Sequence, residues 1–276
     1  MPTPELKVGQ VIVSSVSGRR YKVRALLGRG GFGRAYRAVR VNRAGRSMGE
    51  VCVKTTRDQA SWHREAYFGD LLRGNRRVIQ IHDAFPLVRR PAGRTVVLFC
   101  LAAELAEQGA VRECLERASR PWSPARASRE VMALLKVLGE LHRSQVTHRD
   151  ITPDNIFVCG RGTLKLGDFG IATQQLGRRV PVLDAFNSDF VSRRVLHGVS
   201  PRWGSVDDVF QMGQLLAMLL LGQADGLVTA RTLRRIECSA ALRAVITRAI
   251  GPRGRRYADA GKMFMALRRA RGRKTA

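Results

Sequence analysis

The sequence lacks long apolar runs and a leader-like N-terminus. No apolar run reaches the ~18 residues that a membrane-spanning helix requires, and the longest candidate, residues 215–221, predicts a core helix. The opening MPTPELKVGQ has neither the basic region nor the apolar stretch of a secretory signal, which argues against export. We therefore expect a cytoplasmic protein without a membrane span.

Paired cysteines are also missing. The cysteines are odd in number, scattered along the chain and never spaced as CxxC (Cys52, Cys100, Cys114, Cys159 and Cys238). This distribution argues against a disulfide framework and against a zinc site. We expect reduced thiols that are mostly packed in the interior.

Acidic residues are scarce, at 22 against 49 lysines and arginines, and the formal net charge of +27 comes almost wholly from arginine. A surface of this kind can bind nucleic acid, an acidic protein or anionic lipid. The arginines are, however, spread along the chain without RGG repeats or interleaved aromatic residues, and a GC-rich coding sequence also enriches arginine. We favour this second explanation and expect at most weak, nonspecific binding of nucleic acid.

The 276 residues allow about two domains of the usual ~100 to 200 residues. Residues 21–54 predict a sheet, because apolar and basic side chains alternate on either side of a glycine cluster. Gly28, Gly30 and Gly33 form GxGxxG, which alone is a weak signal, because dinucleotide-binding folds use it ahead of a helix. Here the alternation continues into a second strand, which argues against the dinucleotide-binding type of glycine-rich loop.

Further strands and helices are predicted by the same patterns. Residues 78–85 and 95–107 indicate two strands, parted by PLVRRPAGR. Residues 110–118, 124–144 and 205–222 predict helices, as do SAALRAVITRAI and ADAGKMFMALRRA near the end. Most of the second half of the chain should therefore be helical.

The stretch 148–155, HRDITPDN, follows apolar residues at helical spacing. Pro153 ends any helix because it has no amide hydrogen, so Asp150 and Asn155 are expected on a loop before a strand at 156–158. Asp168 follows at the end of the next strand, in KLGDFG, where Gly170 lets the backbone turn. One of these groups can receive a proton while the others bind a hard cation such as magnesium.

The order and spacing of these motifs resemble those of the protein kinases, over residues from about 11 to 269. The resemblance implies a bacterial eukaryotic-like serine/threonine protein kinase with an α+β, two-lobed fold. Its N-lobe would be a small antiparallel β-sheet with one main helix, and its C-lobe larger and helical. The expected parts are an N-terminal extension or first strand at 1–20, the N-lobe at 21–104, the C-lobe at 105–270 and a basic tail at 271–276.

The resemblance also implies a role for each motif residue. Asp150 would orient the substrate hydroxyl and accept its proton, while Asn155 and Asp168 would bind Mg²⁺ that bridges the phosphates of ATP. Lys54 would hold the α and β phosphates, and a glutamate on the next helix would orient it. Glu65 is the expected partner, with Asp70 as the competitor, because Glu65 shares a helical face with Trp62 and Phe68.

ATP would be contacted by the glycine-rich hairpin, by Lys54 and by the segment after the last strand of the sheet. In that segment Ala103 would lie behind the adenine and Ala106 would offer its amide to the base. The expected nucleotide-binding residues are Leu27, Gly28, Arg29, Gly30, Gly31, Phe32, Gly33, Ala35, Lys54, Glu104 and Ala106.

Three departures from the family pattern leave other functions open. Thr152 stands where serine/threonine kinases usually carry a lysine, and no APE follows the activation loop, which is expected between Gly170 and Trp203. Asn187 stands where a threonine near the catalytic aspartate is common. Arg194 takes the position of the APE glutamate, so its usual partner, matched by Arg256, needs another acceptor, such as Asp184, Asp189 or backbone carbonyls. The alternatives are a nucleotide-binding pseudokinase scaffold and a basic module that binds nucleic acid.

Two further residues are matched through the resemblance. Asp208 would tie the long helix at 205–222 to the backbone of the catalytic loop. Arg149 would pair with a phosphate on the activation loop, on Thr173, Ser188 or Ser192.

Overall fold

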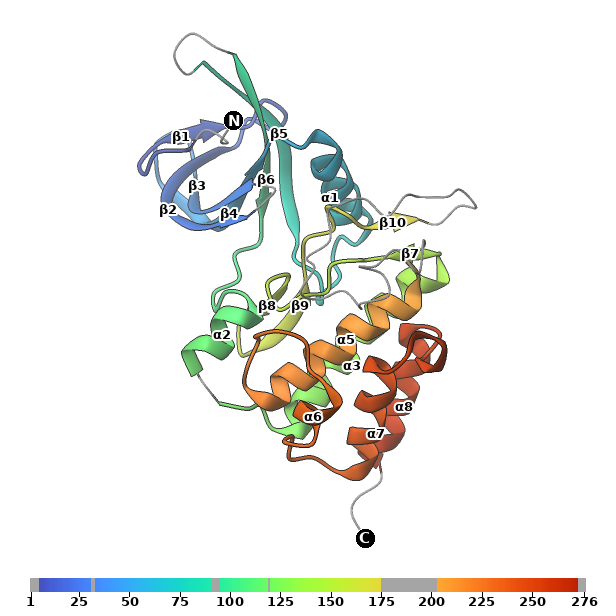
Figure 1. The fold of residues 1–276 in the computed structure, drawn as a ribbon. Coiled ribbons are helices and arrows are strands. Elements are labelled where there is room, and N and C mark those ends of the chain that lie inside the picture. Colours follow the sequence, from blue (N-terminus) through green and yellow to red (C-terminus); the bar gives the residue numbers. More distant parts are fainter. Residues whose placement is uncertain (1–4, 31–32, 91–94, 119, 175–202, 273–276) are drawn as a thin grey trace. The chain divides into compact units, whose positions relative to one another are not determined.

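The computed structural model describes residues 5–30, 33–90, 95–118, 120–174 and 203–272. The chain divides into two compact units, residues 1–107 and residues 108–276, which we call the sheet unit and the helical unit. Figure 1 shows an antiparallel sheet with one main helix in the first unit and mostly helices in the second. The α+β class predicted from the sequence is confirmed.

The sheet unit contains one six-stranded antiparallel sheet in the order β1-β2-β3-β4-β6-β5. Residues before position 20 contribute its first strand, which pairs with β2. The strands are β1 Val11–Val13, β2 Arg20–Gly30, β3 Gly33–Val41, β4 Ser47–Thr56, β5 Ile81–Arg89 and β6 Val96–Ala103.

Strand β5 continues through Pro86, where the sequence predicted a break. Pro86 pairs with Phe99, and the strand runs on to Arg89. Because β5 is at the edge of the sheet, a residue without an N–H group removes no hydrogen bond on the open side. The prediction that PLVR separates two strands is therefore wrong.

The core of the sheet unit is aromatic and β-branched. Tyr21 and Phe85 are fully buried, and their rings stack with centroids 5.9 Å apart. Helix α1, Gln59–Leu71, begins after Asp58, whose side chain accepts a hydrogen bond from Ser61 N. Trp62 Nε1 donates to Cys100 O at 3.0 Å, which fixes α1 against strand β6.

The helical unit holds most of the helices and two small strand pairs. Strand β8 pairs with β9, and β7 pairs with β10. The helices are α2 Val111–Ala118, α3 Pro124–Arg143, α5 Ser205–Leu221, α6 Ala230–Leu233, α7 Ala240–Ile250 and α8 Ala260–Gly272, and the strands are β7 Val146–Thr147, β8 Ile156–Cys159, β9 Thr163–Leu166 and β10 Thr173–Gln174.

Helix α5 lies at the centre of this unit and is buried almost along its whole length. Its Gly213 lets α7 approach closely, since a Cβ there would lie 2.7 Å from the Cβ of Ala249. Within the described ranges, no helix is both long and apolar enough to cross a membrane.

Candidate active site

The loop at residues 148–155, which the resemblance implies to be the catalytic loop, is held by a buried carboxylate on α5. Asp208 is fully buried and accepts hydrogen bonds from His148 N at 2.8 Å and Arg149 N at 3.0 Å. It also accepts from His142 Nε2 at 3.0 Å and Trp203 Nε1 at 2.8 Å. The prediction that Asp208 ties α5 to the loop backbone is confirmed.

The environment of Asp208 favours its ionised form. Burial alone opposes ionisation, but the hydrogen bond and charge of His142 and the amide of His148 outweigh it, so the pKa of Asp208 is lowered. His142 Nδ1 accepts from Ala260 N, so its Nε2 carries the hydrogen that Asp208 receives. Burial lowers the pKa of His148, whose neutral ring packs against Phe169 at 4.5 Å.

Gln211, one helical turn after Asp208, fixes the next part of the loop. Its Oε1 accepts from Ile151 N at 2.9 Å, and its Nε2 donates to Arg149 O at 3.2 Å. Asp150 therefore lies between two backbone positions that α5 holds.

The β8–β9 pair brings the three proposed metal and proton-transfer residues together. Ile156 pairs with Leu166, and Gly167 N donates to Asn155 O at 3.0 Å, so Asp168 follows immediately after a contact with Asn155. Asn155 Nδ2 donates to Asp150 Oδ2 at 2.7 Å and to Asp150 O at 3.1 Å. The backbone contact thus places Asp168 next to the Asp150–Asn155 pair at one end of a hairpin.

The backbone is strained at both motifs. Arg149 has φ +73° and Asp168 has φ +54°, and with Gln145 they are the non-glycine residues with positive φ in the described part of the chain. Such conformations are uncommon for residues other than glycine and concentrate at functional sites. The hydrogen bonds from Asp208 and Gln211 hold the strained loop at Arg149.

In the sheet unit, the structure brings Lys54 and Glu65 together. Lys54 Nζ lies 2.7 Å from Glu65 Oε2, and the glutamate side chain is 10% exposed. The competitor Asp70 instead pairs with Arg73 and is 72% exposed. The sheet predicted to end at Lys54 extends further, because strand β4 continues to Thr56.

The glycine-rich residues form the ends of β2 and β3. Gly33 is required by packing, because a Cβ there would lie 2.1 Å from Thr55 O. A Cβ on Gly28 or Gly30 would meet no atom within 4 Å, so contacts inside the chain do not explain these two glycines. Leu27 is 48% exposed, and Arg29 pairs with Glu5 at 2.7 Å. Gly31 and Phe32 lie outside the described residues.

Ala35 pairs with Lys54 across β3 and β4, which places it beside the lysine. Strand β6 ends at Ala103, and Glu104 follows it, with its N donating to Gln80 O at 2.8 Å. In the part of the chain that the structure describes, the Ala106 amide donates no hydrogen bond and can serve a ligand.

Two of the three departures from the family pattern have a structural counterpart, whereas Asn187 lies outside the described residues. Thr152 is 1% exposed, so this position is turned into the protein. Arg256 Nη1 lies 3.2 Å from Asp207 Oδ1, with both side chains under 5% exposed, and Arg256 also donates to Gly251 O and Val206 O. The predicted backbone acceptors are confirmed, whereas Arg194, Asp184 and Asp189 lie outside the described residues.

The sequence patterns did not indicate that Asp207 is the carboxylate that pairs with Arg256. It also pairs with Arg253 at 3.0 Å and accepts from Gly204 N, so one buried aspartate forms ion pairs with two arginines. Burial lowers the pKa of Arg256 to about 10, and Asp207 opposes this effect. A buried pair of this kind holds the start of α5 against the segment before α8.

Sequence patterns did not reveal the residues that support the loop. His142, Gln211 and Trp203 belong to separate segments, and a lone buried histidine or glutamine carries no motif. The loop phosphosites Ser188 and Ser192 lie outside the described residues. Thr173 is in β10, opposite Thr147, and its Oγ1 donates to Ile171 O at 3.3 Å.

Comparison with known proteins assigns the family. Residues 21–238 match the family model described as protein kinase domain. Similar proteins include the serine/threonine-protein kinase PEPKR2 of Arabidopsis thaliana, 29% identical over 78% of this chain and 44% of that protein. The putative cyclin-dependent kinase F-2 of Oryza sativa subsp. japonica is 30% identical over 59% of this chain and 50% of its own.

Cyclin-dependent kinase 4 of Mus musculus is 30% identical over 57% of this chain and 54% of that protein. The chain thus spans about half the length of these curated relatives. The family model covers well over half of the chain, in the region that contains all the motifs above. The chain therefore belongs to the protein kinase family.

Proposed function

We propose that this protein kinase transfers the γ-phosphoryl group of ATP to serine or threonine hydroxyls of protein substrates. The observation that carries the proposal is the arrangement at the β8–β9 hairpin. There Asn155 donates to Asp150 Oδ2 at 2.7 Å and Gly167, next to Asp168, donates to Asn155 O at 3.0 Å. Gathering a base and two oxygen ligands in this way suits phosphoryl transfer.

Asp150 is the group that receives the proton. The substrate hydroxyl oxygen forms a bond to the γ-phosphorus, the bond from that phosphorus to the β,γ-bridging oxygen breaks, and ADP leaves. The hydroxyl proton passes to the Asp150 carboxylate. The Asn155 amide fixes one oxygen of this carboxylate, and Asp208 and Gln211 hold the flanking backbone.

In the sheet unit, Lys54 holds the α and β phosphates of the nucleotide, and its pair with Glu65 at 2.7 Å fixes the ammonium group. Gly28 and Gly30 leave space for phosphates because no described residue lies within 4 Å of their Cβ positions. The exposed side chain of Leu27, the segment from Gly28 to Ala35 and the backbone at Glu104 and Ala106 complete the nucleotide contacts.

The residues at the hairpin fit magnesium. Mg²⁺ binds hard oxygen ligands and is commonly held by one or two carboxylates together with substrate phosphates. Asn155 directs its Nδ2 to Asp150, which leaves Oδ1 as its ligand atom, and Asp168 supplies a carboxylate. When bound, the ion would neutralise charge on the phosphates.

Serine/threonine specificity, the compact bacterial type and a cytoplasmic location are parts of the same proposal. The relative named as a serine/threonine-protein kinase supports the first. The second candidate is a nucleotide-binding pseudokinase scaffold, which the loss of the lysine at Thr152 favours.

Incubation with labelled ATP, magnesium and a protein acceptor separates the two candidates. The kinase proposal predicts label on serine or threonine after acid hydrolysis, and its loss in Asp150→Asn. The matched control is Asp154→Asn, since Asp154 is nearby and 45% exposed but pairs only with Arg112 among the described contacts. Nucleotide binding without transfer in the wild type would establish the scaffold instead.

A further inference from the structure

The C-terminal part of the helical unit carries a large excess of positive charge. Residues 230–276 contain fourteen lysines and arginines against two acidic residues, so a sixth of the chain supplies nearly half of the net charge of +27. Chance spreading of arginine along the chain would give a more even distribution. A GC-rich coding sequence does not predict that arginine is concentrated in one part of the chain.

Some of these cations are used inside the fold. Arg243 donates to the carbonyls of Leu233 and Ile236, and Arg253 and Arg256 pair with Asp207. Arg248 lies over the ring of Tyr257 at 4.5 Å. These side chains support the helices and are not available to a partner.

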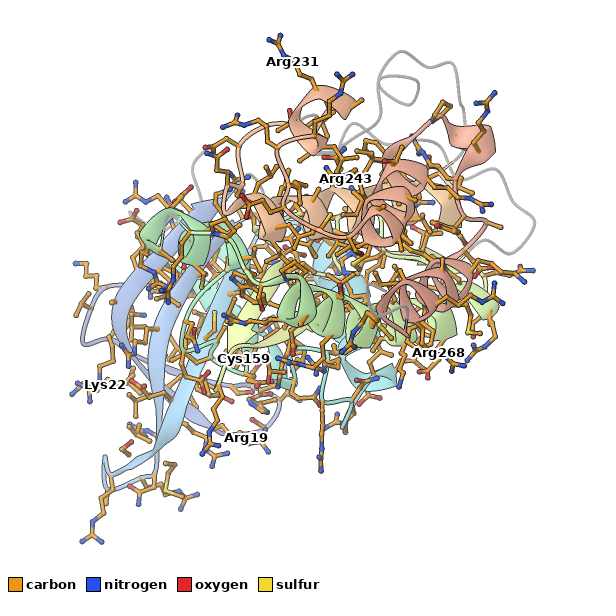
Figure 2. The ribbon with its side chains drawn as sticks, turned by 90° about the horizontal axis from the view of Figure 1, so that it is seen from below. Arg19, Lys22, Cys159, Arg231, Arg243 and Arg268 are labelled. Carbon is orange, nitrogen blue, oxygen red and sulfur yellow. The ribbon has the colours of Figure 1, made fainter. Side chains whose placement is uncertain are left out.

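Seven other arginines of this part are exposed, among them Arg255 and Arg271. The remaining five we call the C-terminal basic surface: Arg231, Arg234, Arg235, Arg268 and Arg269. They come from α6, from the turn after it and from α8. Helix α7 contacts both helices, and all three lie in the lower part of the helical unit in Figure 1. In Figure 2, Arg231 projects away from the ribbon at α6. Over the described ranges, none of the five side chains has an ion pair or a hydrogen bond.

The chemistry around these arginines selects one kind of partner. Met265, at 39%, is the one large apolar side chain exposed in the described residues of the helical unit. Protein interfaces need buried apolar or aromatic anchors, and membrane-surface helices need an apolar face, so neither partner fits. Recognition here must rest on charge.

Single-stranded nucleic acid does not fit either, because its bases stack on exposed aromatic rings. Trp122 is 9% exposed, and the guanidinium of Arg126 lies 3.5 Å above its ring. Tyr257 is 7% exposed and covered by Arg248. Duplex nucleic acid needs no such ring, because its phosphates lie on the outside and its bases are stacked inside.

We propose that the C-terminal basic surface binds the phosphate backbone of duplex nucleic acid without reading its sequence. Arginines form strong hydrogen bonds to phosphate oxygens, and arginines spread over several helices can follow a rod of regularly spaced charges. This proposal does not depend on phosphotransferase activity, so Asp150→Asn should bind a duplex as well as the wild type does.

The test measures binding of the full chain to a labelled duplex of about 24 base pairs and mixed sequence, by fluorescence anisotropy. Five phosphate contacts predict a slope of about −4.5 in log K against log salt, which is a loss of about 500-fold between 50 and 200 mM salt. Changing all five arginines of the surface to Gln should remove most of this slope. Changing them to Lys should retain it, since charge and not side-chain shape is used.

The matched control replaces five exposed cations of the sheet unit, Lys7, Arg24, Arg43, Arg46 and Arg76, with Gln. It changes net charge equally and should leave most of the slope. An equal loss in both Gln variants would show that diffuse charge binds the duplex and would overturn the proposal. So would tighter binding to vesicles with anionic lipid, to an acidic protein or to one particular sequence. Circular dichroism checks that each variant is folded.

Discussion

Replacing Asp208 with Asn changes one atom of the fully buried carboxylate that holds the catalytic loop. Oδ1 accepts from Arg149 N and Trp203 Nε1, and Oδ2 accepts from His148 N and His142 Nε2. The amide NH₂ of Asn would take the place of one oxygen and would face two N–H donors. Each buried donor left without an acceptor costs about 1 to 3 kcal/mol. We therefore expect Asp208→Asn to lower the free energy of unfolding of the helical unit by about 2 to 6 kcal/mol.

Urea unfolding followed by tryptophan fluorescence measures this loss. A Trp62→Phe background, used for every protein compared, leaves only Trp122 and Trp203, which both lie in the helical unit. Asp225→Asn is the control, since its side chain is 89% exposed and 3.7 Å from Arg112, and should change stability by less than about 0.5 kcal/mol. A loss below about 1 kcal/mol in Asp208→Asn would refute the reasoning.

The pH dependence provides an internal check. Because the pKa of Asp208 is lowered in the folded protein, its contribution is present above the unfolded pKa, near 4, and disappears as pH falls through the folded pKa. Protonated aspartic acid resembles asparagine, so the stability difference between wild type and Asp208→Asn should shrink as pH is lowered from about 5. A difference that stays constant would contradict the assigned ionisation.

Three further predictions concern packing and charge. Asp207→Ala leaves the buried guanidinium of Arg256 without its carboxylate and should lower the free energy of unfolding in urea by about 3 to 5 kcal/mol. Adding Arg256→Met in a double variant should recover much of this loss, and no recovery would contradict the pairing. Burial and the Asp83 carboxylate raise the pKa of Tyr21, so the free energy of unfolding of the wild type should fall as pH rises above about 10. Tyr21→Phe should lack this loss, and parallel curves of unfolding free energy against pH would exclude the effect. Gly33→Ala should destabilise the sheet unit by about 1 to 3 kcal/mol, because the added Cβ would meet Thr55 O. Gly30→Ala should cost less than about 1 kcal/mol, because its Cβ would meet no described atom. Equal shifts of the melting temperature in the two variants would disprove this.

Local patterns predicted the elements that periodicity and backbone chemistry determine. The helical face shared by Trp62, Glu65 and Phe68 is the buried face of α1, so the spacing alone indicated which carboxylate meets Lys54. Pro86 was misjudged as a break, because only the order of the strands shows that β5 is an edge where proline is tolerated.

Long-range pairs could not be predicted in the same way. His142 and Asp208 are far apart in sequence, and Asp207 meets Arg253 and Arg256 only after α5 and the segment before α8 have packed. A buried aspartate beside an arginine-rich stretch has the same sequence signature as an exposed one. Asp207 thus takes the acceptor role that the sequence left open for the Arg256 guanidinium.

The central claim is that Asp150 accepts the proton while Asp168 binds the metal, and paired measurements of transfer and binding test it most directly. Asp150→Asn should retain magnesium-dependent ATP affinity and lower the rate of phosphoryl transfer by about 10² to 10⁴. Asp168→Asn should instead weaken magnesium-dependent nucleotide binding, and Asp154→Asn should change neither quantity. Full transfer activity in both Asp150→Asn and Asp168→Asn would contradict the account.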